Sequence, residues 1–316
     1  MLQSLGKRYY RNRWREKVLN DYLDYLRKKG DKPSTISWSK EKGLIFWEWL
    51  NNTYPESRPV DNNMILAYFD YRRSCGIKES TIAGDARVLF AFFKWCYATG
   101  RLDINPCAGL RKPRHTPCEQ EPYTPAEISR IITYLNNQNN YRDVAIILFL
   151  ADTGIRITAM TNITKFDIDM SRRVVKVKDK YDKRRRLSWG DRTNKALWDY
   201  MNTRKDTCEY LFTSERKPVK LTRSGVYRLF KRACEGAHVE FRKPHLLRTY
   251  FASQFLLAGG PERAHQLRMA MGLSDNSQLE SVYAAVVMRD QAMLAMQELS
   301  PGDRIPALPP PPLISR

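Results

Sequence analysis

Apolar residues recur at helical spacing through the first hundred residues of the chain. The segment KVLNDYLDYLRKKG places its apolar residues on one helical face: Val18, Leu19, Tyr22, Leu23 and Leu26. This pattern stops at Gly30, and a second amphipathic segment follows Ser34. Asp61 and Ser80 suit the N-caps of a third and a fourth helix, and Gly100 suits the end of the fourth. The spacing predicts four packed helices.

The composition changes after this helical block. The stretch NPCAGLRKPRHTPCEQEPYTP is rich in proline, which cannot continue a helix, so we interpret it as an extended linker. We therefore predict a basic extension over residues 1–16, a helical domain over 17–104 and a linker over 105–123. The linker holds three basic residues, Arg111, Lys112 and Arg114. They suit a strap that lies along phosphates, although a solvated basic linker is equally ordinary.

A second domain is predicted over residues 124–300. Thr124 with Pro125 and Glu127 forms a capping box, and the buried helix that ends near Ala151 breaks at DTGIR. The segment RRVVKVKDKYDKRRRLSW alternates in its first half and predicts a basic β-hairpin. Further helices are predicted near 191–203, 222–235, 245–258, 261–271, 275–285 and 289–299. The Pro-rich tail, 301–316, is expected to be extended or disordered. The fold class is thus mainly α with a small β-sheet.

The charge of the chain points to a polyanionic partner. Lys and Arg number 54 against 34 Asp and Glu, a formal net charge of +20, which favours nucleic acid. An anionic membrane is the second choice, because the basic residues do not lie opposite one apolar stripe. The longest apolar run, 144–151, is too short to span a bilayer, and the first residues lack the apolar core of a secretory signal. We expect a cytoplasmic, nucleoid-associated protein without a membrane segment.

Four features in order along the chain carry a family resemblance. They are ADTGIRITAM, the basic hairpin, an H-x-L-R box at His245 and a downstream tyrosine in LESVYAAV. This ordered set resembles the tyrosine recombinase (phage integrase) family, and the resemblance extends over both domains. It implies a helical, SAM-like core-binding domain followed by a mixed α/β catalytic domain.

The resemblance assigns roles to particular residues. It places the first catalytic arginine at Arg156, the second at Arg248 beside His245, the hairpin lysine at Lys180 and the nucleophile at Tyr283. Lys178 or Lys183 could instead be the working lysine, and Tyr250 and Tyr181 are the nearby rivals of Tyr283. Basic hairpin residues are expected to contact DNA: Lys178, Lys183, Arg184 and Arg185.

The pattern H-x-L-R occurs twice, at His245 and at His265. The family separates its second arginine from the tyrosine by an interval that fits Arg248, whereas Arg268 lies much closer to Tyr283. We therefore assign His265 to a helix surface and His245 to the site.

The implied chemistry agrees with the residue types. In-line attack on a phosphodiester develops negative charge on the non-bridging oxygens, which two guanidinium groups can hold by charge-assisted bonds. An imidazole in a cationic pocket can accept the phenol proton, and an ammonium such as that of Lys180 can protonate the leaving oxygen. The six cysteines show no C-x-x-C and no zinc spacing with histidine, so we predict no metal and no cofactor.

The chain departs from the family pattern near MAMGLSDN. Leu273 stands where the family usually has a histidine or tryptophan that binds phosphate, so that donor is missing unless Ser274 or Asn276 replaces it. Ala159 stands where an acidic residue is common, and Thr249 where histidine is common.

The resemblance predicts a site-specific recombinase that acts on double-stranded DNA as a homotetramer on two sites. The helical domain starts near residue 17, which leaves no room for an additional arm-binding domain and favours an Xer-like or transposon-type enzyme. The alternatives are a DNA relaxase like the type IB topoisomerases and a sequence-specific DNA-binding protein with weakened catalysis. A nicked DNA site would separate them by adduct formation, strand exchange or relaxation.

Overall fold

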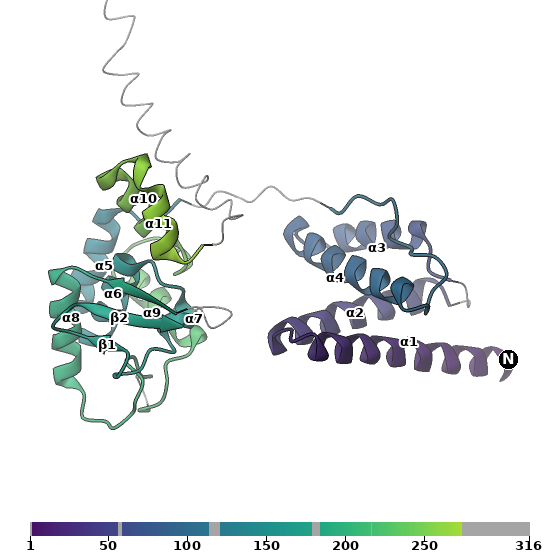
Figure 1. Ribbon diagram of the computed structural model, residues 1–316, viewed down its shortest axis with the longest axis horizontal. Coiled ribbons are helices and arrows are strands. Elements are labelled where there is room, and N and C mark those ends of the chain that lie inside the picture. Colours follow the sequence, from purple (N-terminus) through teal and green to yellow (C-terminus); the bar gives the residue numbers. More distant parts are fainter. Residues whose placement is uncertain (1, 56–58, 114–120, 179–183, 216, 274–316) are drawn as a thin grey trace, which may run out of the picture. The chain divides into compact units, whose positions relative to one another are not determined.

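The computed structural model describes residues 2–55, 59–113, 121–178, 184–215 and 217–273. The chain divides into two units, residues 1–119 and 120–316, and each unit is described by itself. Figure 1 shows the helical first unit and the mixed second unit.

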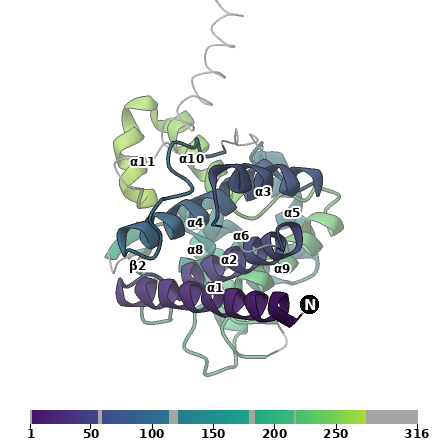
Figure 2. The same cartoon turned by 90° about the vertical axis from the view of Figure 1, so that its right-hand side faces the viewer.

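Four helices occupy the described part of the first unit: α1 (Leu2–Lys28), α2 (Pro33–Thr53), α3 (Asn62–Ser74) and α4 (Glu79–Ala98). Helices α1 and α2 pack against each other (Figure 2), and α4 packs on α2 and α3. Aromatic rings fill the space between them, with Phe46 in edge-on contact with Tyr68 at 5.1 Å and with Phe93 at 5.8 Å between ring centroids. The unit is held by this apolar core.

Helix α1 begins at Leu2 and not near residue 17, so residues 2–16 are helical where a separate extension was expected. No proline interrupts this segment, and a helix already fixed by packing extends through it at little cost.

Two predicted helix starts also differ from the structure. Helix α2 starts at Pro33, before Ser34 and not after it. Helix α4 starts after Lys78 without a side-chain cap, so Ser80 is not its N-cap. Proline is favoured in the first helical turn, which explains the earlier start of α2. The Asp61 cap is confirmed, since its Oδ1 accepts from Met64 N at 2.9 Å.

A charged cluster is buried in the first unit. Asp85 of α4 is fully buried and pairs with Arg72 of α3 at 3.0 Å and with Lys42 of α2 at 3.4 Å. Burial and the nearby Asp85 carboxylate raise the pKa of Tyr68. Loss of the Asp85 charge would leave Arg72 and Lys42, two cations with little access to water, without their buried anion.

The predicted linker is anchored at both ends. Cys107 is buried in the core of the first unit, and Asn62 of α3 donates to the carbonyl oxygens of Pro106 and Ala108. At the other end Tyr123 is buried in the core of the second unit. Both ends of the predicted linker thus contact the core of a packed unit.

The second unit surrounds one buried helix. The capping box at Thr124 is confirmed at the start of α5 (Pro125–Asn137), where Glu127 N donates to Thr124 Oγ1 at 3.2 Å. Helix α6 (Tyr141–Thr153) is buried along most of its length, and α8 (Asp191–Thr203) packs on it. The remaining helices are α7 (Ile157–Met160), α9 (Arg223–Gly236), α10 (Leu246–Gly259) and α11 (Ala264–Met271), the last preceded by a 3-10 turn at 261–263.

A small antiparallel sheet has the order β1 (Ile168–Asp169), β2 (Val174–Lys178) and β3 (Arg184–Ser188). The β2–β3 pair runs from Val174 opposite Ser188 to Lys178 opposite Arg184, which confirms the predicted hairpin. Helices α10 and α11 lie together at one end of the unit in both views (Figures 1 and 2), and α11 contacts β3.

Candidate active site

Arg156 lies at a sharp break between two helices. Helix α6 ends at Thr153, and Gly154 adopts the left-handed conformation with φ +56°. A side chain at Gly154 would meet the Phe251 ring at 2.3 Å, so glycine is required both by the backbone and by the close approach of α10. The break places Arg156 at the N-cap of α7, half-buried, with its Nη2 donating to the carbonyl of Gly272 at 3.3 Å.

Arg248 lies in the first turn of α10 and is buried, with 3% of its surface exposed. Its Nη1 donates to the carbonyl of Gly154 at 2.5 Å, and its Nη2 donates to the carbonyl of Met271 at 2.6 Å. Because the donor is charged, these bonds are stronger than bonds between neutral groups. Arg248 thus connects the TGIR segment, which contains Arg156, with the end of α11.

A third guanidinium reaches the same helix end. Arg185 of β3 donates from Nη1 to the carbonyl of Ala270. The carbonyls of Ala270, Met271 and Gly272 therefore accept, in that order, from Arg185, Arg248 and Arg156. The carboxyl end of a helix carries partial negative charge, which attracts cationic side chains. Three positive charges from three separate elements meet at the last turn of α11.

His245 precedes α10 at the N-cap position. Desolvation, followed by the positive charges of Arg248, Arg156 and Arg223, lowers the pKa of His245 below its ordinary value. The imidazole is therefore neutral at neutral pH and able to accept a proton, while part of its side chain remains exposed.

The segment before His245 is fixed by a buried tyrosine. Tyr123 OH donates to the carbonyl of Arg242 at 2.5 Å and accepts from Arg242 N at 2.9 Å. The Arg242 guanidinium also binds the Glu127 carboxylate at 2.8 Å. These contacts tie the start of α5 to the chain that leads into α10, which holds His245 and Arg248 in place.

Leu273 does not offer a polar group to the arginines. It follows the left-handed Gly272 and packs against a small apolar cluster: Ala252, Leu256, Leu267 and Met271. Its backbone N donates to the carbonyl of Arg268 at 3.1 Å. The leucine therefore has a packing role between α10 and α11.

The other residues from the sequence analysis fall into three groups. His265 is exposed on α11, separate from His245, while Arg268 is half-buried. Lys178 and Arg184 are exposed and form the last pair of the β2–β3 ladder, next to residues 179–183. Arg111 is exposed in the linker, and Lys112 lies over the Phe90 ring at 5.4 Å. Several predicted residues lie outside the described residues: Arg114, Lys180, Lys183, Ser274, Asn276 and Tyr283.

Sequence reasoning missed the end of α11 as an acceptor and placed Arg185 only among DNA contacts. Carbonyl oxygens have no signature in a sequence. The alternation of side chains along a strand was an available signal. It places Arg185 on the same face of β3 as the apolar Leu187, which is buried, and so on the face that packs against the protein.

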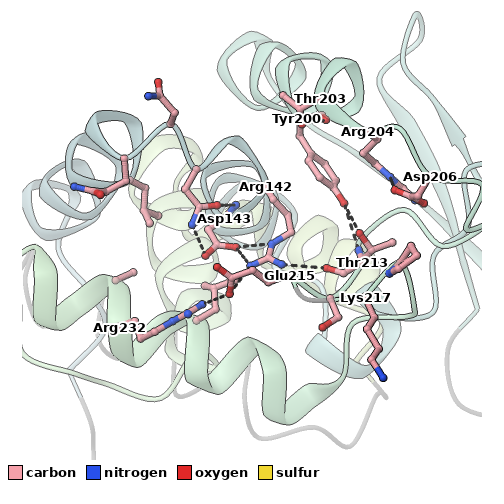
Figure 3. Close-up of a pocket in the computed structure, with 18 of the residues that line it drawn as sticks. Arg142, Asp143, Tyr200, Thr203, Arg204, Asp206, Thr213, Glu215, Lys217 and Arg232 are labelled. Carbon is pink, nitrogen blue, oxygen red and sulfur yellow. Dashed lines mark hydrogen bonds and ion pairs between the residues drawn. The ribbon is translucent and has the colours of Figure 1, made fainter.

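A separate pocket lies between the ends of α5, α6, α8 and α9 (Figure 3). Four of its charged side chains form a connected group: Glu215 binds Arg232 at 2.7 Å and lies 3.9 Å from Arg142, which binds Asp143 at 2.6 Å. Burial raises the pKa of Asp143. Neither Arg156 nor Arg248 lines this pocket, so it is distinct from the arginine cluster.

The described residues hold neither a candidate metal site nor a candidate membrane span. No group of His, Cys, Asp or Glu there has the arrangement of a metal site. No helix there has the length and apolar character needed to cross a membrane.

Comparison with known proteins identifies the family of this chain. The chain belongs to the phage integrase family, whose model matches residues 122–289. The tyrosine recombinase XerC of Corynebacterium glutamicum is 28% identical over 197 residues, covering 60% of this chain and 62% of the relative. XerC of Syntrophus aciditrophicus is 28% identical over 224 residues, covering 66% and 71%. The first match thus spans less than two thirds of its relative.

Solved structures share the fold at low sequence identity. The Tn1549 transposon integrase in complex with circular intermediate DNA matches with a TM-score of 0.68 and 19% identity, covering 87% of this chain and 98% of that one. A lambda integrase dimer bound to a COC′ core site matches with a TM-score of 0.68 and 17% identity, covering 85% and 76%. The mainly helical fold with a small sheet is therefore that of the integrases.

Proposed function

We propose that this protein is a site-specific tyrosine recombinase that cleaves and rejoins DNA strands through a 3′-phosphotyrosyl intermediate. The observation that carries the proposal is the convergence of Arg156 with His245 and Arg248 from two places far apart in the sequence. Family membership gives this cluster its context. Tyr283 is the proposed nucleophile, and integration, excision or resolution of a mobile element is the proposed biological role.

Each group has a defined part in the proposed reaction. Arg156 and Arg248 hold the non-bridging oxygens, on which negative charge develops during in-line attack. His245, neutral at neutral pH, accepts the proton of the Tyr283 phenol. Lys180 protonates the leaving 5′-oxygen, with Lys178 and Lys183 as its rivals. The phosphotyrosyl bond conserves the energy of the broken diester, so neither ATP nor a metal ion is required.

Double-stranded DNA is the proposed partner. A net charge of +20 supports binding to the phosphate backbone. Related structures support an assembly on DNA, since one is described as a lambda integrase tetramer bound to a Holliday junction. We propose a homotetramer on two DNA sites for this chain, acting on nucleoid DNA in the cytoplasm.

The proposal is tested with a pool of random-sequence duplexes. The protein is incubated with the pool, covalent complexes are isolated under denaturing conditions, and the attached DNA is sequenced. We expect one sequence class to be enriched, with the protein joined to a 3′-phosphate through Tyr283. Tyr283→Phe should retain DNA affinity and form no adduct, whereas Tyr250→Phe should form it. Absence of any adduct with the wild-type protein, or an adduct that persists in Tyr283→Phe, contradicts the proposal.

A DNA-binding protein with weakened catalysis is the second candidate, and Leu273 is the observation that favours it. Its side chain packs between α10 and α11 and supplies no hydrogen-bond donor. Loss of one oxyanion donor costs about 2.7–4 kcal/mol when nothing replaces it. Selective DNA binding by the wild-type protein without adduct would favour this candidate.

A further inference from the structure

Arg185 lies on a different face of the hairpin from its basic neighbours. It pairs with Val177 across the β2–β3 ladder, and Val177 is buried. Directly opposite residues in a sheet point to the same side, so Arg185 belongs to the face that packs on the protein. Arg184 and Arg186, one residue away on either side, are exposed.

The burial pattern of the two strands supports this assignment. In β2 the buried positions are Val175 and Val177, and in β3 the more buried positions are Arg185 and Leu187. A contact with DNA phosphates suits the opposite, exposed face, whereas Arg185 reaches the end of α11 and donates to the carbonyl of Ala270. Packing between β3 and α11 agrees with this direction.

The acceptor turn connects Arg185 to the two proposed catalytic arginines. The next two carbonyls, of Met271 and Gly272, accept from Arg248 and Arg156. A shift in the last turn of α11 therefore moves the acceptors of both guanidinium groups at once. Displacement of reacting groups by about 1 Å can reduce a rate about 100-fold.

We propose that Arg185 is a positioning residue: it holds the last turn of α11 so that Met271 and Gly272 orient Arg248 and Arg156 toward the scissile phosphate. It acts through α11 and not through contact with DNA. This inference rests on the proposed recombinase function.

The experiment uses the full-length protein and the duplex that the wild-type protein selects from the random pool. The duplex carries a nick beside the cleavage site, so that the adduct accumulates and its single-turnover rate can be measured at saturating protein. Arg185→Met retains most of the side-chain length on the buried face. We expect its adduct rate to fall about 10- to 100-fold, with little change in the salt dependence of DNA binding.

Arg186→Met is the matched control, because it removes the same charge from the exposed face of the same strand. Its adduct rate at saturating protein should equal that of the wild-type protein. Arg185→Lys retains a charged donor without the planar guanidinium, so its rate should lie between those of the wild-type protein and Arg185→Met.

A methylphosphonate at the scissile position separates positioning from general damage to the fold. This neutral linkage develops less charge and depends less on Arg156 and Arg248. The rate ratio between wild-type protein and Arg185→Met should therefore decrease on the methylphosphonate. A merely structural defect would leave the ratio unchanged on both substrates.

Several outcomes would overturn the inference while the recombinase function stands. One is a wild-type adduct rate in Arg185→Met. Another is an unchanged rate combined with weaker binding and a salt slope reduced by about one, which would make Arg185 a phosphate contact. If Arg185→Met fails to fold, Arg185→Lys decides, and a wild-type rate on the natural phosphodiester overturns the inference. Failure of the wild-type protein to form any adduct would instead contradict the proposed function.

Discussion

Replacement of Arg248 by methionine should destabilise the second unit as well as impair catalysis. The substitution removes two charge-assisted hydrogen bonds, of 2.5 Å to Gly154 and 2.6 Å to Met271, from a side chain that is 3% exposed. Hydrogen bonds to charged groups contribute about 1.5–3 kcal/mol each, so their loss amounts to about 3–6 kcal/mol. Relief from burying a charge offsets part of this loss. We expect the free energy of unfolding to fall by about 3 kcal/mol.

Thermal unfolding followed by calorimetry measures this effect. For a domain of roughly 200 residues, 1 kcal/mol corresponds to about 2–4 °C, so the transition of the second unit should fall by about 6–12 °C. Arg156→Met is the matched control, since its described bond to Gly272 is longer, at 3.3 Å, and its side chain is half-buried. Its loss should stay near 1 kcal/mol or below. Equal and small losses in the two variants would refute the reasoning.

Three further outcomes are expected. Gly154→Ala should lower the melting temperature of the second unit and slow adduct formation. The left-handed backbone costs alanine about 1–2 kcal/mol, and the new methyl group meets the Phe251 ring at 2.3 Å. NMR titration of the DNA-free protein should give His245 a pKa below its ordinary value of 6.5. Arg223→Gln should raise this pKa, because it removes a nearby positive charge. A wild-type pKa above 6.5 would contradict the prediction. Asp85→Asn should destabilise the first unit by about 3–5 kcal/mol, measured by urea unfolding, and leave the transition of the second unit unchanged.

The sequence predicted elements whose ends depend on local chemistry. Asp61 and Thr124 cap their helices through their own oxygen atoms, and Gly154 ends α6 because it tolerates positive φ. Such signals involve residues within one helical turn. The start of α1 could not be predicted in this way, because residues 2–16 hold no proline and their cap-type residues, Ser4 and Asn12, lie inside the helix.

The candidate site was only partly predictable for a related reason. Arg156, His245 and Arg248 stand in recognisable motifs, and the structure places them near one another. The contacts that hold them are long-range and end on main-chain oxygens, which every residue has. The position of Arg185 beside α11 depends on strand register and on packing between β3 and α11, and neither follows from a count of basic residues.

The use of main-chain acceptors at the end of α11 affects which inherited changes this site can tolerate. A codon change at Ala270 or Met271 alters the side chain but leaves the carbonyl oxygen that binds the guanidinium group. Loss or gain of one residue within α11 is different, because it rotates everything beyond it by about 100° and shifts it by about 1.5 Å. Natural variants of this helix should therefore differ in residue type outside its buried positions, Leu267 and Met271, and rarely in length.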